Sequence, residues 1–241
     1  MTRQRHKESG NVFVFILLGV ILFGALIYTF TSSGQQGISS LTKKEAELAA
    51  NEMLNYARIV EQTVNRLRAG GCAESQISFN NSVVSGYSNP NSPVDGSCEV
   101  FNQNGGGLTW QTPSETWLDS QYSAETEYGE WNFSHKNCVG NLGAVPCAQD
   151  TPSAVDLLIQ LPLIKSEICE SINKKVGGPI PLVDATAAHR YELADGDYTE
   201  PSTTTIIAAG ISGKTTACFG ADNAAPIPDG APTFYHVLII R

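Results

Sequence analysis

The sequence predicts an α+β protein, in which a long N-terminal helix packs on an antiparallel β-sheet with one additional helix, stabilised by disulfides. Three observations support this fold class. First, the N-terminal part contains an uncharged apolar stretch followed by an amphipathic stretch. Second, the rest of the chain contains short apolar runs separated by Gly, Asn, Pro and Ser. Third, six cysteines are spread through that second part. We therefore expect a basic leader (1–10), a transmembrane helix (11–31), a glycine-weakened joint with an amphipathic helix (32–70) and an extracytoplasmic α+β domain (71–241).

The composition excludes one large class of partners. The formal net charge of the 241 residues is −9, and no cluster of lysine or arginine occurs outside the first ten residues. Binding to nucleic acid needs a basic surface that neutralises phosphates. We therefore expect no nucleic-acid partner.

The apolar stretch runs from Val12 to Phe30 without a charged residue. As a helix it extends over about 29 Å, which is enough to cross the hydrocarbon core of a bilayer. Arg3, Arg5 and Lys7 precede it, and no charged residue follows before Lys43. This asymmetry predicts a single span with a cytoplasmic N-terminus and contact with membrane lipid.

Three interpretations of this segment remain open. A cleaved secretory signal usually has a shorter apolar region of about 7–15 residues, whereas an uncleaved signal anchor fits the length. The third interpretation begins with Gly10, which ends the basic leader. A short basic leader that ends in glycine before an uninterrupted apolar helix resembles the start of type IV pilin-like proteins, including pseudopilins and minor pilins.

The resemblance covers only about the first thirty residues, and a generic signal anchor has similar features. It implies cleavage after Gly10 by a prepilin peptidase, which leaves Asn11 as the new N-terminus. The chain departs from major pilins at the first and fifth mature positions. These hold Asn11 and Phe15, where major pilins carry an aromatic residue or methionine and a glutamate. The departures favour a minor or atypical member.

The function that the resemblance implies is structural and non-enzymatic, without a cofactor. The chain would assemble with other pilin-like subunits, or with itself, through its apolar helix in the inner membrane, with the domain in the periplasm or outside the cell. The small residues Gly19, Gly24 and Ala25 permit close helix packing. The alternatives are a membrane-tethered binding module that forms no filaments and, third, a tethered periplasmic hydrolase.

A second helix is expected behind the apolar stretch. Gly34 and Gly37 each weaken a helix by about 1 kcal/mol relative to alanine, and Thr42–Glu45 matches a capping box. We therefore expect a restart at Thr42 and an end near Arg68. One apolar stripe is predicted at Leu41, Leu48, Met53, Tyr56, Val60, Val64 and Leu67, and an exposed surface at Lys44, Glu47, Asn51, Asn55, Arg58 and Gln62.

The remainder predicts seven strands and one helix. The strands are Gln76–Phe79, Cys98–Asn102, Gly129–His135, Val155–Leu161, Thr203–Ala209, Thr215–Phe219 and Thr233–Ile240. A helix is expected at Ile164–Val176, because Gly177 and Gly178 stop it. The residues Asn104–Gly107 predict a hairpin turn. The C-terminal run alternates poorly, so we expect this strand to be covered on both faces.

The six cysteines include no C-x-x-C pair, so no zinc ribbon or thioredoxin-type motif is present. In an exported domain they predict three disulfides. The competing interpretation is free thiols in a cytosolic protein. Six cysteines allow fifteen connectivities, of which we prefer the pairing of sequence neighbours, because short loops close at the lowest entropy cost. The preferred pairs are Cys72–Cys98, Cys138–Cys147 and Cys169–Cys218.

Motifs for chemistry are weak. The glycines of Gly210–Thr215 are too close together for a phosphate loop. Asp195, Asp197 and Glu200 are spaced like a fragment of a calcium loop but lack the terminal bidentate acid. A turn between strands and a solvated acidic turn are the favoured interpretations.

No histidine pair has the spacing of metal ligands on a helix, so His135, His189 and His236 are expected to be surface or packing residues. Five aromatic residues gather within a short stretch, namely Trp110, Trp117, Tyr122, Tyr128 and Trp131. A binding surface for sugar or protein is one interpretation of them. Core packing is the favoured one.

Overall fold

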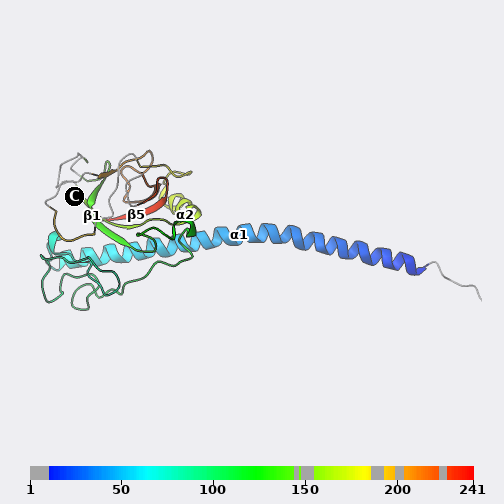
Figure 1. Ribbon diagram of the computed structural model, residues 1–241, viewed down its shortest axis with the longest axis horizontal. Helices are drawn as coiled ribbons and strands as arrows, with labels where there is room; N and C mark the ends of the chain where they lie inside the picture. Colours follow the sequence, from blue (N-terminus) through cyan, green and yellow to red (C-terminus); the bar gives the residue numbers. More distant parts are fainter. Residues whose placement is uncertain (1–10, 144–146, 148–154, 186–192, 199–203, 223–226) are drawn as a thin grey trace, which may run out of the picture. The chain divides into compact units, whose positions relative to one another are not determined.

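The computed structural model describes residues 11–143, 147, 155–185, 193–198, 204–222 and 227–241, without the side chains of 11–15, 22–41 and 204. The chain divides into two compact units, residues 1–45 and 46–241. The second unit contains all the strands (Figure 1). Its fold is α+β, as predicted. The elements are α1 (Asn11–Ala69), β1 (Asn132–Val139), β2 (Asp156–Leu161), α2 (Ser166–Val176), β3 (Thr204–Ile206), β4 (Thr216–Gly220) and β5 (Pro232–Ile239), with short 3-10 turns at Glu74–Gln76 and Ser120–Tyr122.

Helix α1 runs without interruption from Asn11 to Ala69. Gly34 and Gly37, which the sequence predicts to weaken the helix, do not interrupt it, and no new helix starts at Thr42. Starting a second helix requires a new, unfavourable nucleus, whereas continuing through a glycine costs only about 1 kcal/mol. The end lies where the sequence predicts it, and there the N–H of Gly70 donates to the carbonyl of Arg66 at 2.9 Å. Among the residues whose side chains are described, no helix has the length and apolar character to cross a membrane.

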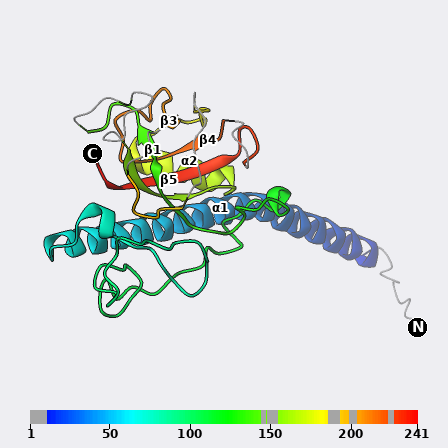
Figure 2. The same cartoon turned by 60° about the vertical axis from the view of Figure 1, so that its left-hand side comes forward.

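Within the second unit, the C-terminal part of α1 is buried on a wide surface. Strand β5 lies along one side of the helix, and the segment drawn in teal to green after α1 lies on the other side (Figure 2). The buried residues of the helix are Ala46, Ala49, Ala50, Met53, Leu54, Tyr56, Ala57, Val60, Thr63, Val64 and Leu67. Five residues of the predicted stripe are among them, but Leu48 is 59% exposed and Leu41 lies outside the described side chains. All six residues predicted on the opposite surface are exposed.

The sheet has five strands in the order β3-β1-β2-β5-β4. Three neighbouring pairs are antiparallel, but β1 and β3 are parallel, with Asn137 opposite Thr204. The sheet is therefore mixed, and the expectation of an antiparallel sheet is wrong. A parallel pair needs a long crossover connection, and here the chain between β1 and β3 contributes β2 and α2 before it returns.

Five of the predicted strands correspond to β1 to β5, with shifted ends. The first two predicted strands are wrong, because the segments around Ser78 and Glu99 share only one isolated parallel bridge. Turns use the backbone groups there instead, since the N–H of Gly106 donates to the Glu99 carbonyl at 2.8 Å and that of Leu108 to the Val100 carbonyl at 3.2 Å. The predicted turn at Asn104–Gly107 is thus present without flanking strands.

Both faces of the sheet are covered. The face toward α1 and α2 forms one core with Tyr56, Trp131, Phe133 and Phe234, and the other face packs Leu158, Ile206, Phe219 and Tyr235. All eight residues of β5 are buried, which confirms the prediction for the C-terminal run. The predicted helix is also confirmed as α2, and it ends at Gly177, whose φ of +69° suits glycine.

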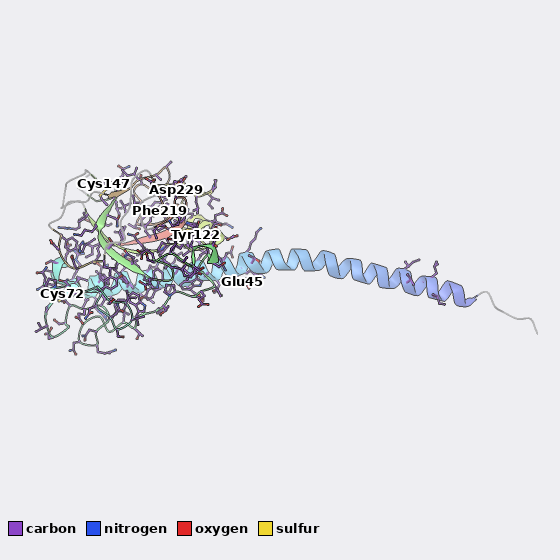
Figure 3. The ribbon with its side chains drawn as sticks, viewed as in Figure 1. Glu45, Cys72, Tyr122, Cys147, Phe219 and Asp229 are labelled. Atoms are coloured by element: carbon purple, nitrogen blue, oxygen red, sulfur yellow. A yellow bond between two sulfur atoms is a disulfide. The ribbon has the colours of Figure 1, made fainter. Side chains whose placement is uncertain are left out.

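The structure contains three disulfides, Cys72–Cys98, Cys138–Cys147 and Cys169–Cys218. These are the pairs preferred from the sequence. The first disulfide joins the segment just after α1 to the loops that follow it, and the second holds the end of β1. The third joins α2 to β4. Cys72 and Cys147 are labelled in Figure 3. The disulfides therefore close loops with sequence separations of 26, 9 and 49 residues.

The outer edge of β4 is closed by a side chain of α2. The Asn173 amide accepts from the N–H of Cys218 at 2.8 Å and donates to the carbonyls of Cys218 at 2.9 Å and Pro179 at 2.8 Å. Both side-chain groups thus imitate a neighbouring strand. An edge strand with free backbone groups is open to pairing with another chain, and Asn173 removes that opening at Cys218.

Candidate functional site

The predicted processing and packing residues lie at the start of α1. Gly10 lies outside the described residues, and Asn11 is the first residue of the helix. Gly19 lies on the helix, and nothing is within 4 Å of the position that its Cβ would occupy. Gly24 and Ala25 also belong to α1, but their side chains lie outside the described ones. Gly19 therefore has no packing partner among the described residues.

The described side chains near Gly19 are apolar and exposed to solvent. Ile16, Leu17, Leu18, Val20 and Ile21 are all exposed, with Val20 at 68%. Successive helical residues are separated by about 100°, so these five side chains cover an arc of about 200° around the helix axis, and Gly19 faces the remaining direction. A surface helix of a soluble domain shows an apolar stripe on one side only. The exposed apolar surface of this stretch is therefore wider than such a stripe.

The aromatic residues of 110–131 are mainly part of the core. Trp131 is buried between Tyr56 at 5.0 Å and Phe234 at 6.3 Å, measured between ring centroids. Trp110 packs edge-on against Phe133 at 5.8 Å. Trp110, Trp117, Tyr122 and Tyr128 are only partly buried, and each packs against a buried apolar cluster. Core packing therefore explains the cluster, as favoured from the sequence.

In the acidic turn, the Asp195 carboxylate is hydrogen-bonded to other groups of the protein. The Asp195 carboxylate lies 2.8 Å from Nε2 of His135 and accepts the N–H of Asp197 at 2.9 Å. Burial lowers the pKa of His135. Glu200 and His189 lie outside the described residues. Among the described residues, no three His, Cys, Asp or Glu side chains gather in a way that could hold a metal ion.

A buried carboxyl lies near the C-terminus. Asp156 on β2 is fully buried and accepts the backbone N–H of Val139 at 2.9 Å and that of Arg241 at 3.2 Å. Burial raises the pKa of Asp156 to about 6, although both N–H groups oppose this effect. The Arg241 guanidinium lies 4.6 Å from the centre of the Tyr198 ring. These contacts fix the last residue of the chain beside the sheet.

The strongest polar arrangement joins α1, β5 and β4. Nε2 of His236 lies 3.0 Å from a carboxylate oxygen of Glu61, and its Nδ1 lies 2.5 Å from the hydroxyl oxygen of Thr216. His236 and Thr216 face each other across the β4–β5 pair. A carboxylate, an imidazole and a hydroxyl therefore form one continuous chain of hydrogen bonds from helix to sheet edge.

The hydrogen-bond roles follow from the charge state of the imidazole. Burial lowers the pKa of His236, although the Glu61 carboxylate opposes this, so the ring is neutral near pH 7. In the neutral ring one nitrogen donates and the other accepts. Nε2–H donates to Glu61 and the Thr216 hydroxyl donates to Nδ1, which satisfies all three groups. The arrangement thus fastens α1 to the sheet without a buried charge on the imidazole.

The hydrogen-bonded residues Glu61, His236 and Thr216 border an open groove of about 570 Å³. Three cationic side chains line this groove. Arg58 comes from α1, Lys175 from the last turn of α2 and Lys214 from the turn before β4. The Lys214 ammonium donates to the carbonyl of Val176 at 3.3 Å. Arg58 and Lys175 form no ion pair within the described part of the chain. We call this the cationic groove.

The sequence reasoning missed the cationic groove, because its residues are far apart along the chain. One signal was present. His236 is a polar residue within an apolar strand that is covered on both faces, so a partner for its ring was required. Gly210–Thr215, in contrast, forms the turn before β4 that was predicted in preference to a phosphate loop.

Comparison of the chain with protein-family models, curated proteins and solved structures finds no match.

Proposed function

We propose that this protein is a membrane-anchored structural subunit, resembling a minor pilin or pseudopilin, that assembles through its apolar N-terminal helix. The observation that carries the proposal is the exposed apolar surface of residues 16–21, which extends around more than half of the helix circumference. Covering one such side chain contributes roughly 1.5–3 kcal/mol. Lipid and the helices of neighbouring subunits are the two environments that suit a helix with so wide an exposed apolar surface.

Further support comes from the domain that follows. Three disulfides suit an oxidising compartment outside the cytoplasm. In the part of the chain that the structure describes, Nε2 of His135, the Asp195 carboxylate and both ring nitrogens of His236 are engaged in contacts that hold the fold. The proposed mechanism is therefore association of copies or of related subunits, with the domain facing away from the cytoplasm.

The first test is the mass of the mature chain from membranes. Cleavage by a prepilin peptidase removes residues 1–10, so the expected N-terminal residue is Asn11. An intact leader starting at Met1 would instead favour the alternative, a tethered binding module without filaments.

The second test measures association of the helices. All six cysteines are in disulfides, so an introduced cysteine is the only thiol. Val20→Cys in the full-length membrane-bound chain is expected to form a disulfide dimer on mild oxidation. Val94→Cys is the matched control, because Val94 is fully exposed in a loop of the second unit. Equal dimer yields from both variants would contradict assembly through the helix.

A further inference from the structure

We infer that the cationic groove binds the acidic segment 115–130 of a second copy of this chain. The inference rests on the proposed function, because it adds a contact between domains to the proposed association of helices. It predicts a head-to-tail contact, in which one copy supplies the groove and its neighbour supplies the carboxylates.

The groove has the chemistry for carboxylates. Arg58, Lys175 and Lys214 converge on it from three elements, against one carboxylate, that of Glu61. Glu61 is already occupied by Nε2 of His236. An arginine guanidinium matches the geometry of a carboxylate with two parallel hydrogen bonds, and lysine adds a point charge. The groove is therefore complementary to more than one carboxylate.

The chain itself supplies the complementary surface. Residues 69–135 contain no lysine or arginine, but they contain eight acids, namely Glu74, Asp95, Glu99, Glu115, Asp119, Glu125, Glu127 and Glu130. The last five fall within 115–130, and within the described residues none of these five forms an ion pair. Burial and the neighbouring Glu130 raise the pKa of Glu127. The Lys165 ammonium contacts the segment at the Thr116 carbonyl, to which it donates at 2.8 Å.

Within one copy, the anchored part of the acidic segment lies at the other end of α2 from Lys175. The acidic segment is attached just before α2, because Asp119 N–H donates to the Leu163 carbonyl at 2.9 Å and Lys165 N–H donates to the Trp117 carbonyl at 2.9 Å. Lys175 lies at the opposite end of α2. Eleven helical residues separate these ends by about 16 Å.

A contact between two different surfaces repeats from copy to copy. Such heterologous contacts produce rings or open helical filaments rather than closed twofold dimers. If the N-terminal helices hold copies together, the effective concentration of the acidic segment at the groove is high, and modest electrostatic contacts then suffice. This consequence agrees with the proposed structural role.

The test uses single cysteines in the full-length membrane-bound chain. Gln62→Cys places a thiol beside the groove, and Gln121→Cys places one in the acidic segment. Copies that carry either cysteine are produced together with different tags. The expected product on oxidation is the mixed Gln62→Cys/Gln121→Cys dimer, in excess over both symmetric dimers. Predominance of a symmetric Gln62→Cys dimer overturns the head-to-tail contact.

Charge reversal tests the chemistry of the contact. Arg58→Glu with Lys175→Glu, made in the Gln62→Cys copy, is expected to lower the yield of the mixed dimer about tenfold, because like charges then face each other. Adding Glu115→Lys and Glu130→Lys to the other copy is expected to restore it. All four positions are exposed. The inference is overturned if Arg58→Glu with Lys175→Glu leaves the yield of the mixed dimer unchanged. It is also overturned if Glu115→Lys with Glu130→Lys does not restore that yield.

The Val20→Cys dimer in the same membranes separates the two proposals. If it forms while the mixed dimer does not, the groove contact is wrong and the helix association stands. If neither forms, both are wrong. A cross-link from Gln62→Cys to another protein, with no mixed dimer, also overturns the contact between copies.

Discussion

The buried carboxyl of Asp156 makes the folding stability depend on pH, and Asp156→Asn tests this dependence. Burial raises the pKa of Asp156 from 3.8 to about 6. Below the unfolded pKa the carboxyl is protonated in both states. Between the two values only the unfolded chain loses the proton, so the free energy of unfolding falls as the pH rises. Above the folded pKa the loss is complete.

The magnitude follows from the difference between the two pKa values. The folded value lies about two pKa units above 3.8, and each unit corresponds to about 1.4 kcal/mol. Because Asp156 is fully buried, solvent screening does not reduce this value. The wild-type protein is therefore expected to lose ~3 kcal/mol of stability relative to Asp156→Asn between about pH 3 and pH 7.

Two histidines act in the opposite direction. Burial lowers the pKa of both His135 and His236, so their contribution to stability is lost as the pH falls. The comparison with Asp156→Asn at each pH removes this effect, because both proteins contain the histidines. A constant difference from the changed hydrogen bond also cancels in the pH dependence.

The assay is urea unfolding of the full-length chain in detergent, with the disulfides intact, followed by tryptophan fluorescence. Trp131 is buried in the core and reports the loss of packing. Asp229→Asn is the matched control, because Asp229 is exposed (labelled in Figure 3). The reasoning is refuted if the difference between wild type and Asp156→Asn changes by less than about 1 kcal/mol over this pH range.

Three further substitutions test the packing by the same unfolding measurement. Val60→Ala truncates a fully buried side chain and is expected to lower the free energy of unfolding by about 2–3 kcal/mol. Val83 is exposed, so Val83→Ala is expected to lower it by less than about 0.5 kcal/mol. Equal losses would contradict the burial of α1. Asn173→Ala leaves the buried N–H of Cys218 without its partner and is expected to cost about 2–4 kcal/mol; a cost below about 1 kcal/mol would show that water replaces the amide. The Cys169→Ala/Cys218→Ala double variant opens a loop with a sequence separation of 49 residues and is expected to cost about 4 kcal/mol; an unchanged unfolding midpoint would contradict this.

Sequence reasoning succeeded where the deciding interactions are local. Helix α2 was predicted because its apolar residues recur with helical spacing and Gly177 ends it. The buried state of β5 was predicted from its continuous apolar run. The preferred disulfides joined sequence neighbours, and the structure has the same pairs.

It failed where interactions distant along the chain decide the outcome. The parallel arrangement of β3 beside β1 depends on a crossover that contains β2 and α2, and no local pattern encodes its direction. The expected strand at Gln76–Phe79 failed because turns around Gly96 and Gly106 take the backbone groups nearby. Leu48 was placed on the apolar stripe by spacing alone, although no element covers it.

His236 shows how a local pattern can still indicate a distant site. An imidazole in a strand that is covered on both faces needs hydrogen-bond partners, because an unpaired polar group costs about 1–3 kcal/mol when buried. A partner had to lie on a neighbouring strand or on a helix over the sheet. The exposed polar surface of the predicted helix contained Arg58 and Gln62, with Glu61 beside them. Because Glu61 holds His236 at this point, the helix brings Arg58 close to Lys175 and Lys214. The same contact that satisfies the buried imidazole therefore assembles the cationic groove.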